Sequence, residues 1–171
     1  TLGVTGAVTL STKLATTNLA TGAVLQVKNV QTGAMDTDTT TIPFDDTIPQ
    51  ITEGFEVMTL AFTPISSSSK LLINIVTHTS VSVDSLAVTA LFVGTTANAL
   101  ATSFTHTMGA GDYPHMHSFN HFMISGTTSE LTFRVRVGCN NAGTITFNGR
   151  SAAAKYGGSL ASSITITEIA V

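Results

Sequence analysis

The chain has 171 residues, the length of one domain, and only 10% of them are Asp, Glu, Lys or Arg; Thr, Ser, Ala, Gly and Val dominate, which favours strands over helices. The net charge is −3 and the seven basic residues are scattered from Lys13 to Lys155, which argues against a nucleic-acid partner. Apolar runs are of strand length rather than the ~20 residues that cross a bilayer, which argues against membrane insertion.

Residues 1–22 place a few apolar side chains, such as Leu2, Val4 and Val8, among glycines and threonines, too few for a core layer. We expect an extended arm that packs on its own domain, continues an upstream shaft or adds a strand to a neighbouring chain. The sequence begins at Thr1 without a secretion leader, so we expect a processed chain or a piece of a longer one. Residues 23–171 then form one domain.

The first half of this domain alternates strand-length apolar runs with polar segments. A polar loop is expected at residues 32–41, and the Thr63-Pro64 turn with the serines at 66–69 separates two strands that it cannot continue. The expected strands are residues 23–31, 55–62, 70–79, 83–93 and 101–108.

The second half contains the clearest alternation in the chain, at residues 131–137, where Phe133 and Val135 alternate with Arg134 and Arg136. This pattern predicts a half-buried strand whose arginines face solvent or a partner. Further strands are expected at 115–124, 144–148 and 162–171. Because about nine strands occur at regular spacing and no long 3.6-residue apolar period is present, the predicted fold is all-β: a two-sheet antiparallel sandwich of the jelly-roll type, with the arm in front.

Residues 55–62 and 70–75 are apolar on both faces, whereas a lone sandwich buries only one face of each sheet. With no amphipathic helix to cover the second face, we expect a symmetry-related copy to cover it in a homotrimer with closed rotational symmetry. The arginines would meet acidic residues of the neighbour at the rim of this contact. The expected interface residues are Phe55, Val57, Leu72, Arg134 and Arg136.

Candidate catalytic residues fit poorly. Ser159 follows Gly157 and Gly158, but the segment lacks the final glycine of a nucleophile elbow and precedes a strand rather than a helix. Asp45 and Asp46 are adjacent and would point apart in an extended chain, whereas an acid/base pair must converge on one bond. We expect no catalytic residue and no enzyme.

Several short blocks follow one another in a fixed order along the chain: residues 24–27, 45–73, 133–135, 142–145 and 161–169. The longest runs Asp-Asp-Thr-Ile-Pro-Gln, then Glu-Gly, then Thr-Pro with serines and Lys-Leu-Leu-Ile. This ordered set resembles the terminal domain of bacteriophage tail-fibre and minor virion structural proteins, particularly those from phages of aquatic bacteria. The likeness spans residues 22–171.

This resemblance implies a non-enzymatic structural protein of the virion surface: a tail-fibre or spike head, or a capsid decoration. It implies assembly as an oligomer, commonly a trimer, contact with other virion proteins and a contribution to host attachment. A second hypothesis is a subunit of a cellular extracellular filament, joined by donation of the N-terminal strand in residues 1–22.

His115 and His117 would share one face of a strand, and such a pair can chelate a transition metal. The glycines that flank metal-binding pairs in some phage fibre tips are missing here, so we expect surface or interface histidines. We expect no metal and no cofactor.

Loops 95–100, 109–114 and 153–159 are expected at the ends of the sandwich, where loops carry recognition. Residues 112–117 depart from the resembled pattern, which marks them as a place where a host glycan or protein could be contacted. A carbohydrate face usually has exposed aromatic rings, and this chain has no Trp and two tyrosines. The alternative, loop residues that pack on their own sandwich, stays open. The candidate receptor contacts are Asp112, Tyr113, His115 and Tyr156.

Overall fold

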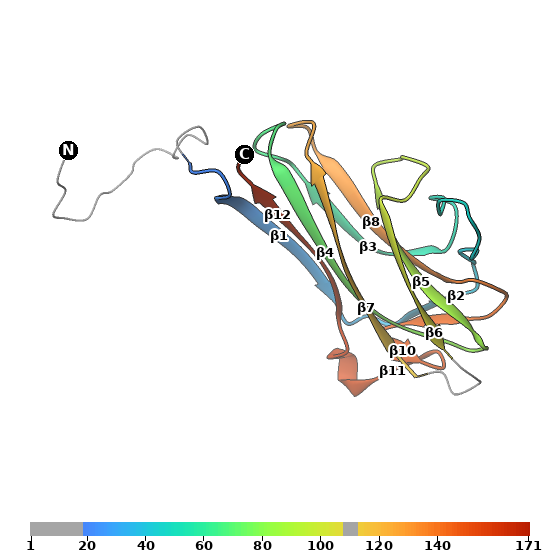
Figure 1. The fold of residues 1–171 in the computed structure, drawn as a ribbon. Helices are drawn as coiled ribbons and strands as arrows, with labels where there is room; N and C mark the ends of the chain where they lie inside the picture. Colours follow the sequence, from blue (N-terminus) through green and yellow to red (C-terminus); the bar gives the residue numbers. More distant parts are fainter. Residues whose placement is uncertain (1–18, 108–112) are drawn as a thin grey trace, which may run out of the picture.

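The structure is a computed structural model that describes residues 19–107 and 113–171. The regular secondary structure of the described part consists almost entirely of strands (Figure 1). A 3-10 turn, η2 (Tyr156–Gly158), precedes the last strand. The strands are β1 (Val24–Thr32), β2 (Asp36–Asp38), β3 (Phe55–Phe62), β4 (Lys70–Val81), β5 (Ser85–Val93), β6 (Ala101–Thr107), β7 (His115–Ile124), β8 (Leu131–Cys139), β9 (Ile145–Phe147), β10 (Gly149–Arg150), β11 (Ala153–Ala154) and β12 (Ser162–Ile169).

The strands form two antiparallel sheets with the order of a jelly roll. One sheet is β3-β8-β5-β6. In the other sheet, β7 pairs with one edge of β4. The opposite edge of β4 pairs first with β12 and further along with β9. β1 pairs with the outer edge of β12, and β2 pairs with the outer edge of β9. Counting β1 with β2 and β12 with β9 as interrupted strands, each sheet has four strands, and successive strands alternate between the sheets except for β5 and β6, which are neighbours in one sheet. The predicted fold class is confirmed.

The core lies between the two sheets and consists of alternate residues from each strand. Leu71, Ile73 and Ile75 of β4 face Phe133 and Val135 of β8, and all five are fully buried. The intervening residues of these strands point outward, as period two requires. The alternation predicted for residues 131–137 is therefore confirmed.

Two details of the strands differ from expectation. Residues 36–38, predicted as part of a polar loop, form β2, because their backbone pairs with β9 although their side chains are polar. In β3 the register against β8 shifts between Glu56 and Met58. This bulge lets both Phe55 and Val57 pack against core clusters, although they lie outside the Met58-Leu60-Phe62 alternation.

The outer face of β3-β8-β5-β6 is covered by the chain itself, and we call it the covered face. Its cover is the segment 39–54, held by Ile42 N–H donating to the Cys139 carbonyl at 2.8 Å. Ile42 is fully buried against Val88 and Phe92 of β5. Gly54 adopts φ +59°, and a Cβ there would lie 2.6 Å from the Val137 carbonyl oxygen, so this close approach requires glycine.

The turn at residues 63–69 is held by a buried carboxylate. Glu168 on β12 is fully buried and accepts hydrogen bonds from the Ser69 hydroxyl, the Gln26 amide and the Ile65 and Ser66 N–H groups. Burial alone would raise the pKa of Glu168, but these hydrogen bonds outweigh it and lower the pKa. The carboxylate thus accepts hydrogen bonds from the Ile65 and Ser66 N–H groups, which have no strand partner in this turn.

The loops gather at two ends of the sandwich. The proximal end holds loops 63–69, 94–100 and 125–130 together with Gly22, whose N–H donates to the Ala170 carbonyl at 2.9 Å (Figure 1). The distal end holds loops 82–84 and 140–144 and the segment 148–161. Within residues 19–107 and 113–171, no helix is long and apolar enough to cross a membrane.

Candidate functional site

A pocket of about 270 Å³ opens at the distal end of the sandwich. Two aromatic rings are exposed there, with 65% of Tyr113 and 82% of Tyr156 accessible to solvent. The pocket therefore combines tyrosine rings with cationic side chains. Its lining residues are Tyr113, Pro114, Arg150, Lys155 and Tyr156.

Arg150 reaches the pocket from a short hairpin in which β10 pairs with β11. The hairpin follows Asn148, which is fully buried, and whose side-chain amide donates to the carbonyls of Thr32 and Ala34. The Ser80 hydroxyl donates to the Gly149 carbonyl at 3.0 Å. The base of the hairpin is therefore fixed to the sheet of β4.

Tyr156 is presented by an unusual backbone. It has φ +52°, a left-handed conformation that non-glycine residues seldom adopt, and Gly157 and Gly158 also have positive φ. Gly33 approaches this turn so closely that a Cβ on it would lie 1.8 Å from the Gly158 carbonyl oxygen. Such strained turns are kept where the surrounding structure holds them, and they concentrate at functional sites.

The electrostatics of the pocket are cationic. The Arg150 guanidinium lies 4.0 Å from the centre of the Tyr113 ring, a cation–π contact that orients both side chains. Lys155 adds a second positive charge at the pocket, and none of the described lining residues is acidic. This arrangement suits a ligand that has both an apolar face and a negative charge.

Of the residues predicted as receptor contacts, Tyr113 and Tyr156 are brought together in the pocket. Asp112 lies outside the described residues. His115 begins β7 and is half-buried opposite Thr79, and it does not line the pocket. Sequence reasoning missed Arg150 and Lys155, because each is a lone cation in a Gly/Ala/Ser-rich segment and nothing local predicts that β10 and η2 meet Tyr113.

The predicted recognition loops do not share one end. Residues 153–159 and Tyr113 lie at the distal end, whereas 94–100 lie at the proximal end, where Ala99 N–H donates to the Pro49 carbonyl. Of the loop predicted at 109–114, residues 109–112 lie outside the described part. One binding surface thus cannot include all three loops of a single chain.

His117 projects toward the core rather than toward a ligand. It is 2% exposed, and its Nε2 lies 2.9 Å from the Thr79 hydroxyl. Burial, with smaller contributions from the nearby His115 and His78, lowers the pKa of His117 to about 4, so the ring is neutral at pH 7. Among the described residues, no group of three His, Cys, Asp or Glu side chains is placed to hold a metal ion.

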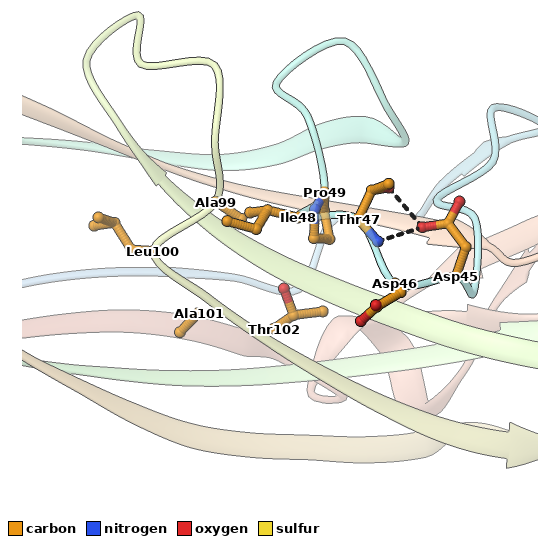
Figure 2. Close-up of a pocket in the computed structure, with 9 residues that line it drawn as sticks. All are labelled: Asp45, Asp46, Thr47, Ile48, Pro49, Ala99, Leu100, Ala101 and Thr102. Carbon is orange, nitrogen blue, oxygen red and sulfur yellow. Dashed lines mark hydrogen bonds between the residues drawn. The ribbon is translucent and has the colours of Figure 1, made fainter.

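A second, more open groove of about 420 Å³ lies between residues 45–49 and the start of β6 (Figure 2). The Asp45 carboxylate accepts hydrogen bonds from the Thr47 hydroxyl at 2.5 Å and the Thr47 N–H at 2.8 Å, which lower its pKa. Figure 2 shows the Asp45 and Asp46 side chains pointing in different directions. Because Asp45 closes a local turn and the two carboxylates do not converge, this groove lacks an acid/base pair.

The outer face of β7, β4, β12 and β1 is a flat surface that we call the open face. Paired residues cross it in rows, and of the sixteen residues in these rows Lys70 alone is charged; its ammonium lies 5.8 Å from the centre of the Phe122 ring. Phe122 is 53% exposed and Ile124 is 62% exposed. The rows, from the proximal end, are Val24-Ile169-Lys70-Ile124, Val27-Thr167-Leu72-Phe122, Asn29-Thr165-Asn74-Asn120 and Gln31-Ser163-Val76-Ser118.

The predicted interface residues divide between the faces. Leu72 lies in the second row of the open face. Phe55 and Val57 instead pack on the core of their own chain, which removes the reason for placing them at an interface. Arg134 pairs with Glu56 of its own chain at 3.0 Å, and Arg136 donates to the Glu53 and Gly54 carbonyls. These last contacts lie on the covered face.

Comparison with known proteins gives likeness at the level of fold. A carbohydrate-binding CBM36-1 domain of a multidomain xylanase, from the hindgut metagenome of Trinervitermes trinervoides, aligns over 82% of this chain and 96% of its own, with 13% identity and a TM-score of 0.39. The protein of the infectious bursal disease virus particle aligns over 87% of this chain, with 9% identity and a TM-score of 0.39. The VP2 subviral particle of the same virus also aligns over 87% of this chain, with 12% identity and a TM-score of 0.36. This chain spans 36% and 38% of those two viral chains.

No protein-family model matches the sequence. No curated protein matches it either. At these identities and TM-scores the structural likeness extends to the β-sandwich and no further.

Proposed function

We propose that this protein is a non-enzymatic structural component of a virion surface, a tail-fibre or spike head or a capsid decoration, which assembles through its open face. The observation that carries the proposal is that face. It exposes Val27, Phe122 and Ile124, each more than half accessible to solvent, on a flat sheet with one charged residue in its four rows. Exposed apolar patches of this kind usually mark contact with another protein.

A second copy of the chain is the partner that this face fits best. Charged groups on a foreign surface would lose their hydrating water against this face without gaining ion pairs or hydrogen bonds in return. A second copy of the face has few charges, so its desolvation costs little free energy. Central polar groups are already paired within the face: Asn74 donates to Asn120 at 2.6 Å, and Asn29 donates to Thr165 at 2.7 Å. Each of these hydrogen bonds satisfies part of an amide group within the face, which lowers the cost of burying it.

We propose a homotrimer, in which the open faces of three copies surround a common axis and each contacts two neighbours. In a closed ring every copy has both of its contact surfaces occupied, so the assembly does not continue into a filament. The resemblance to tail-fibre heads favours the same number, and it also favours a virion location and contact with other virion proteins. The distal pocket, at the end of the sandwich away from Gly22, would be the surface that contributes to host attachment.

A matched pair of substitutions tests the assembly. Phe122 on the open face and Phe104 on β6 are both 53% exposed. We expect Phe122→Glu to abolish the oligomer, because a buried carboxylate without a partner is costly, and Phe104→Glu to leave it intact. Light scattering after gel filtration measures the mass against the 17.7 kDa of one chain.

A wild-type mass of one chain at micromolar concentration would reject assembly. A mass of two chains would keep the face and reject the trimer. Equal loss of the oligomer in both variants would remove the assignment to the open face.

The virion location has its own test. Antibody raised against the purified chain should label intact particles from the source under the electron microscope, and the chain should be present in the mass spectrum of density-purified particles. Labelling of cell-borne filaments instead would support the filament hypothesis.

For the filament hypothesis, the described sandwich offers one relevant observation. Residues 24–107 and 113–169 already supply all eight strands of a jelly roll, counting the interrupted pairs once each. A fold of this kind does not need a donated strand. Deletion of residues 1–22 should therefore leave folding and oligomer formation intact, whereas a donor-strand filament subunit would lose polymerisation.

A further inference from the structure

We propose that the distal pocket binds an acidic saccharide, whose carboxylate or sulfate contacts Arg150 and Lys155 while its ring packs on Tyr156 or Tyr113. This inference names the ligand class for the attachment role in the proposed function and rests on that function only for its biological meaning. The binding itself is a property of the purified chain.

The shape of the pocket favours a single ring. Its volume of about 270 Å³ falls at the lower limit of the ~300–1,000 Å³ that encloses drug-sized ligands. Tyr156 is 82% exposed, although tyrosine normally buries most of its ring in a folded protein. An exposed ring on a turn whose backbone is fixed offers a surface for the apolar C–H face of a sugar.

The charge of the pocket selects an acid over a neutral sugar. Terminal N–H groups of a guanidinium such as that of Arg150 can donate to the oxygens of a carboxylate or sulfate. The guanidinium carbon lies 4.0 Å from the centre of the Tyr113 ring, which holds the Arg150 side chain at the pocket. Lys155, on the segment between β11 and η2, places a second cation at the same pocket.

The chain provides its own reporter for the test. It contains no Trp and two Tyr, and both tyrosines line this pocket, so intrinsic tyrosine fluorescence reports on this pocket alone. Titration with glucuronic acid, N-acetylneuraminic acid and oligogalacturonate should change the fluorescence saturably at millimolar or lower concentration. Glucose and galactose should have no effect, and raising NaCl to about 0.5 M should weaken the binding several-fold, because charge pairs at an open site are screened.

Variants assign the contacts. Arg150→Gln should weaken acidic saccharide binding at least tenfold, Lys155→Gln about threefold, and Tyr156→Ala tenfold when read by calorimetry. Lys70→Gln and Phe104→Ala remove a cation and a half-exposed ring elsewhere on the surface and should leave binding unchanged. If Arg150→Gln lowers the melting temperature, the exposed Tyr156→Ala still decides the question, since its side chain is 82% accessible.

Several outcomes would overturn the inference: no saturable response to any acidic saccharide, equal affinity for neutral sugars, or unchanged binding in Tyr156→Ala. Inorganic phosphate or a phosphopeptide binding as tightly as the saccharides would show an anion site without sugar recognition. A particle-borne trimer that ignores acidic saccharides keeps the proposed function and loses this inference, whereas a monomer that binds them does the reverse.

Discussion

The two sheets of the sandwich present alike inner faces to the core but very different outer faces. On the covered face, Ile42 from segment 39–54 is fully buried over Val88 and Phe92 of β5. On the open face, Phe122 and Ile124 are more than half exposed, and no described segment of the chain lies over them. Segment 39–54 thus covers the outward apolar residues of β5, although Phe104 of β6 on the same face stays 53% exposed, whereas no described segment covers Phe122 and Ile124 on the other sheet.

The charges follow the same division. The covered face carries the ion pair between Glu56 and Arg134 and the hydrogen bonds of Arg136, at the edge of its cover. The rows of the open face carry hydroxyl and amide groups, with Lys70 at the proximal edge. A face that stays in water permanently gains solubility from charge, whereas a face that becomes buried would lose stability from it.

The largest expected difference between the faces is in how much an Ile→Ala substitution lowers the free energy of unfolding. Ile42→Ala should lower the free energy of unfolding by about 2–5 kcal/mol, because it leaves a cavity under segment 39–54. Ile124→Ala, with 62% of the side chain exposed, should cost a dilute monomer less than ~0.5 kcal/mol. Urea denaturation of both variants measures this contrast.

Repeating the denaturation at tenfold higher protein concentration sharpens the comparison. The cost of Ile124→Ala should then rise, because the proposed oligomer would bury this residue, while the cost of Ile42→Ala should not change. A concentration-independent cost at Ile124 would mean that the open face remains in water.

The sequence predicts which residues of β8 in the covered sheet face the core, but it does not predict that segment 39–54 packs over the outer face of this sheet. The alternation at 131–137 correctly places Phe133 and Val135 inside and Arg134 outside, because every core contact of β8 follows period two. The burial of Ile42 could not be predicted, since a lone isoleucine in a polar segment has no period, and its partners on β5 are some fifty residues away.

The inward packing of Phe55 and Val57, which the sequence did not predict, has a specific cause. Phe55 and Val57 belong to the alternate row of a regular strand, and the hypothesis of two apolar faces assumed that regularity. The register shift between Glu56 and Met58 turns the first residues of β3 back toward the core. Bulges depend on the partner strand, so the sequence of β3 alone does not reveal this one. Leu72, on an unbroken strand, lies on the outer face, and its place at an interface stays a prediction.

Acid should destabilise the open sheet from its inner side. His117 on β7 is buried and has a pKa of about 4, against the 6.5 of an exposed histidine. Between these values the unfolded chain binds the proton and the folded chain does not, so stability falls as pH drops from about 6.5 to 4, by roughly 3 kcal/mol in total. Thermal melts between pH 7 and 4 should show this loss, and His117→Phe should reduce it, leaving the smaller slope of His78 and His121, whose pKa values burial also lowers.

Glu168 acts in a lower window. Its lowered pKa contributes stability that is present above the 4.5 of a free glutamic acid and is lost as pH falls through the folded value. A wild-type acid limb confined to the region below pH 4.5, with no slope between 6.5 and 4.5, would therefore contradict the assignment to His117.

The amide row in the middle of the open face should matter to association and little to folding. In a dilute monomer the hydrogen bond from Asn74 to Asn120 is exposed to water, so Asn74→Ala should change the free energy of unfolding by less than ~0.5 kcal/mol. In the oligomer the same change leaves the Asn120 amide buried without its partner, which should weaken association about tenfold, or ~1.4 kcal/mol. Sedimentation of a dilution series measures this.

Asn98→Ala is the matched control, because Asn98 accepts a hydrogen bond from Gln50 at the proximal end, away from the four rows. The oligomer of the Asn98→Ala variant should have the same dissociation constant as the wild-type oligomer. Equal effects of the two substitutions would show that the amide row is not at the interface.

The smallest effect is expected from the ion pair on the covered face. Arg134 donates from Nη1 to both carboxylate oxygens of Glu56, at 3.0 and 3.1 Å, and the two side chains are 29% and 31% exposed. Because water and salt screen such a pair, a double-mutant cycle with Arg134→Gln and Glu56→Gln should give a coupling of about 0.2–1 kcal/mol that shrinks in 1 M NaCl. The dissociation constant should not move, since both partners belong to one chain on a face already covered. Arg134→Gln that weakens association while leaving the monomer unchanged would instead place this arginine against a neighbouring copy, and the covered face would then be a second interface rather than a finished surface.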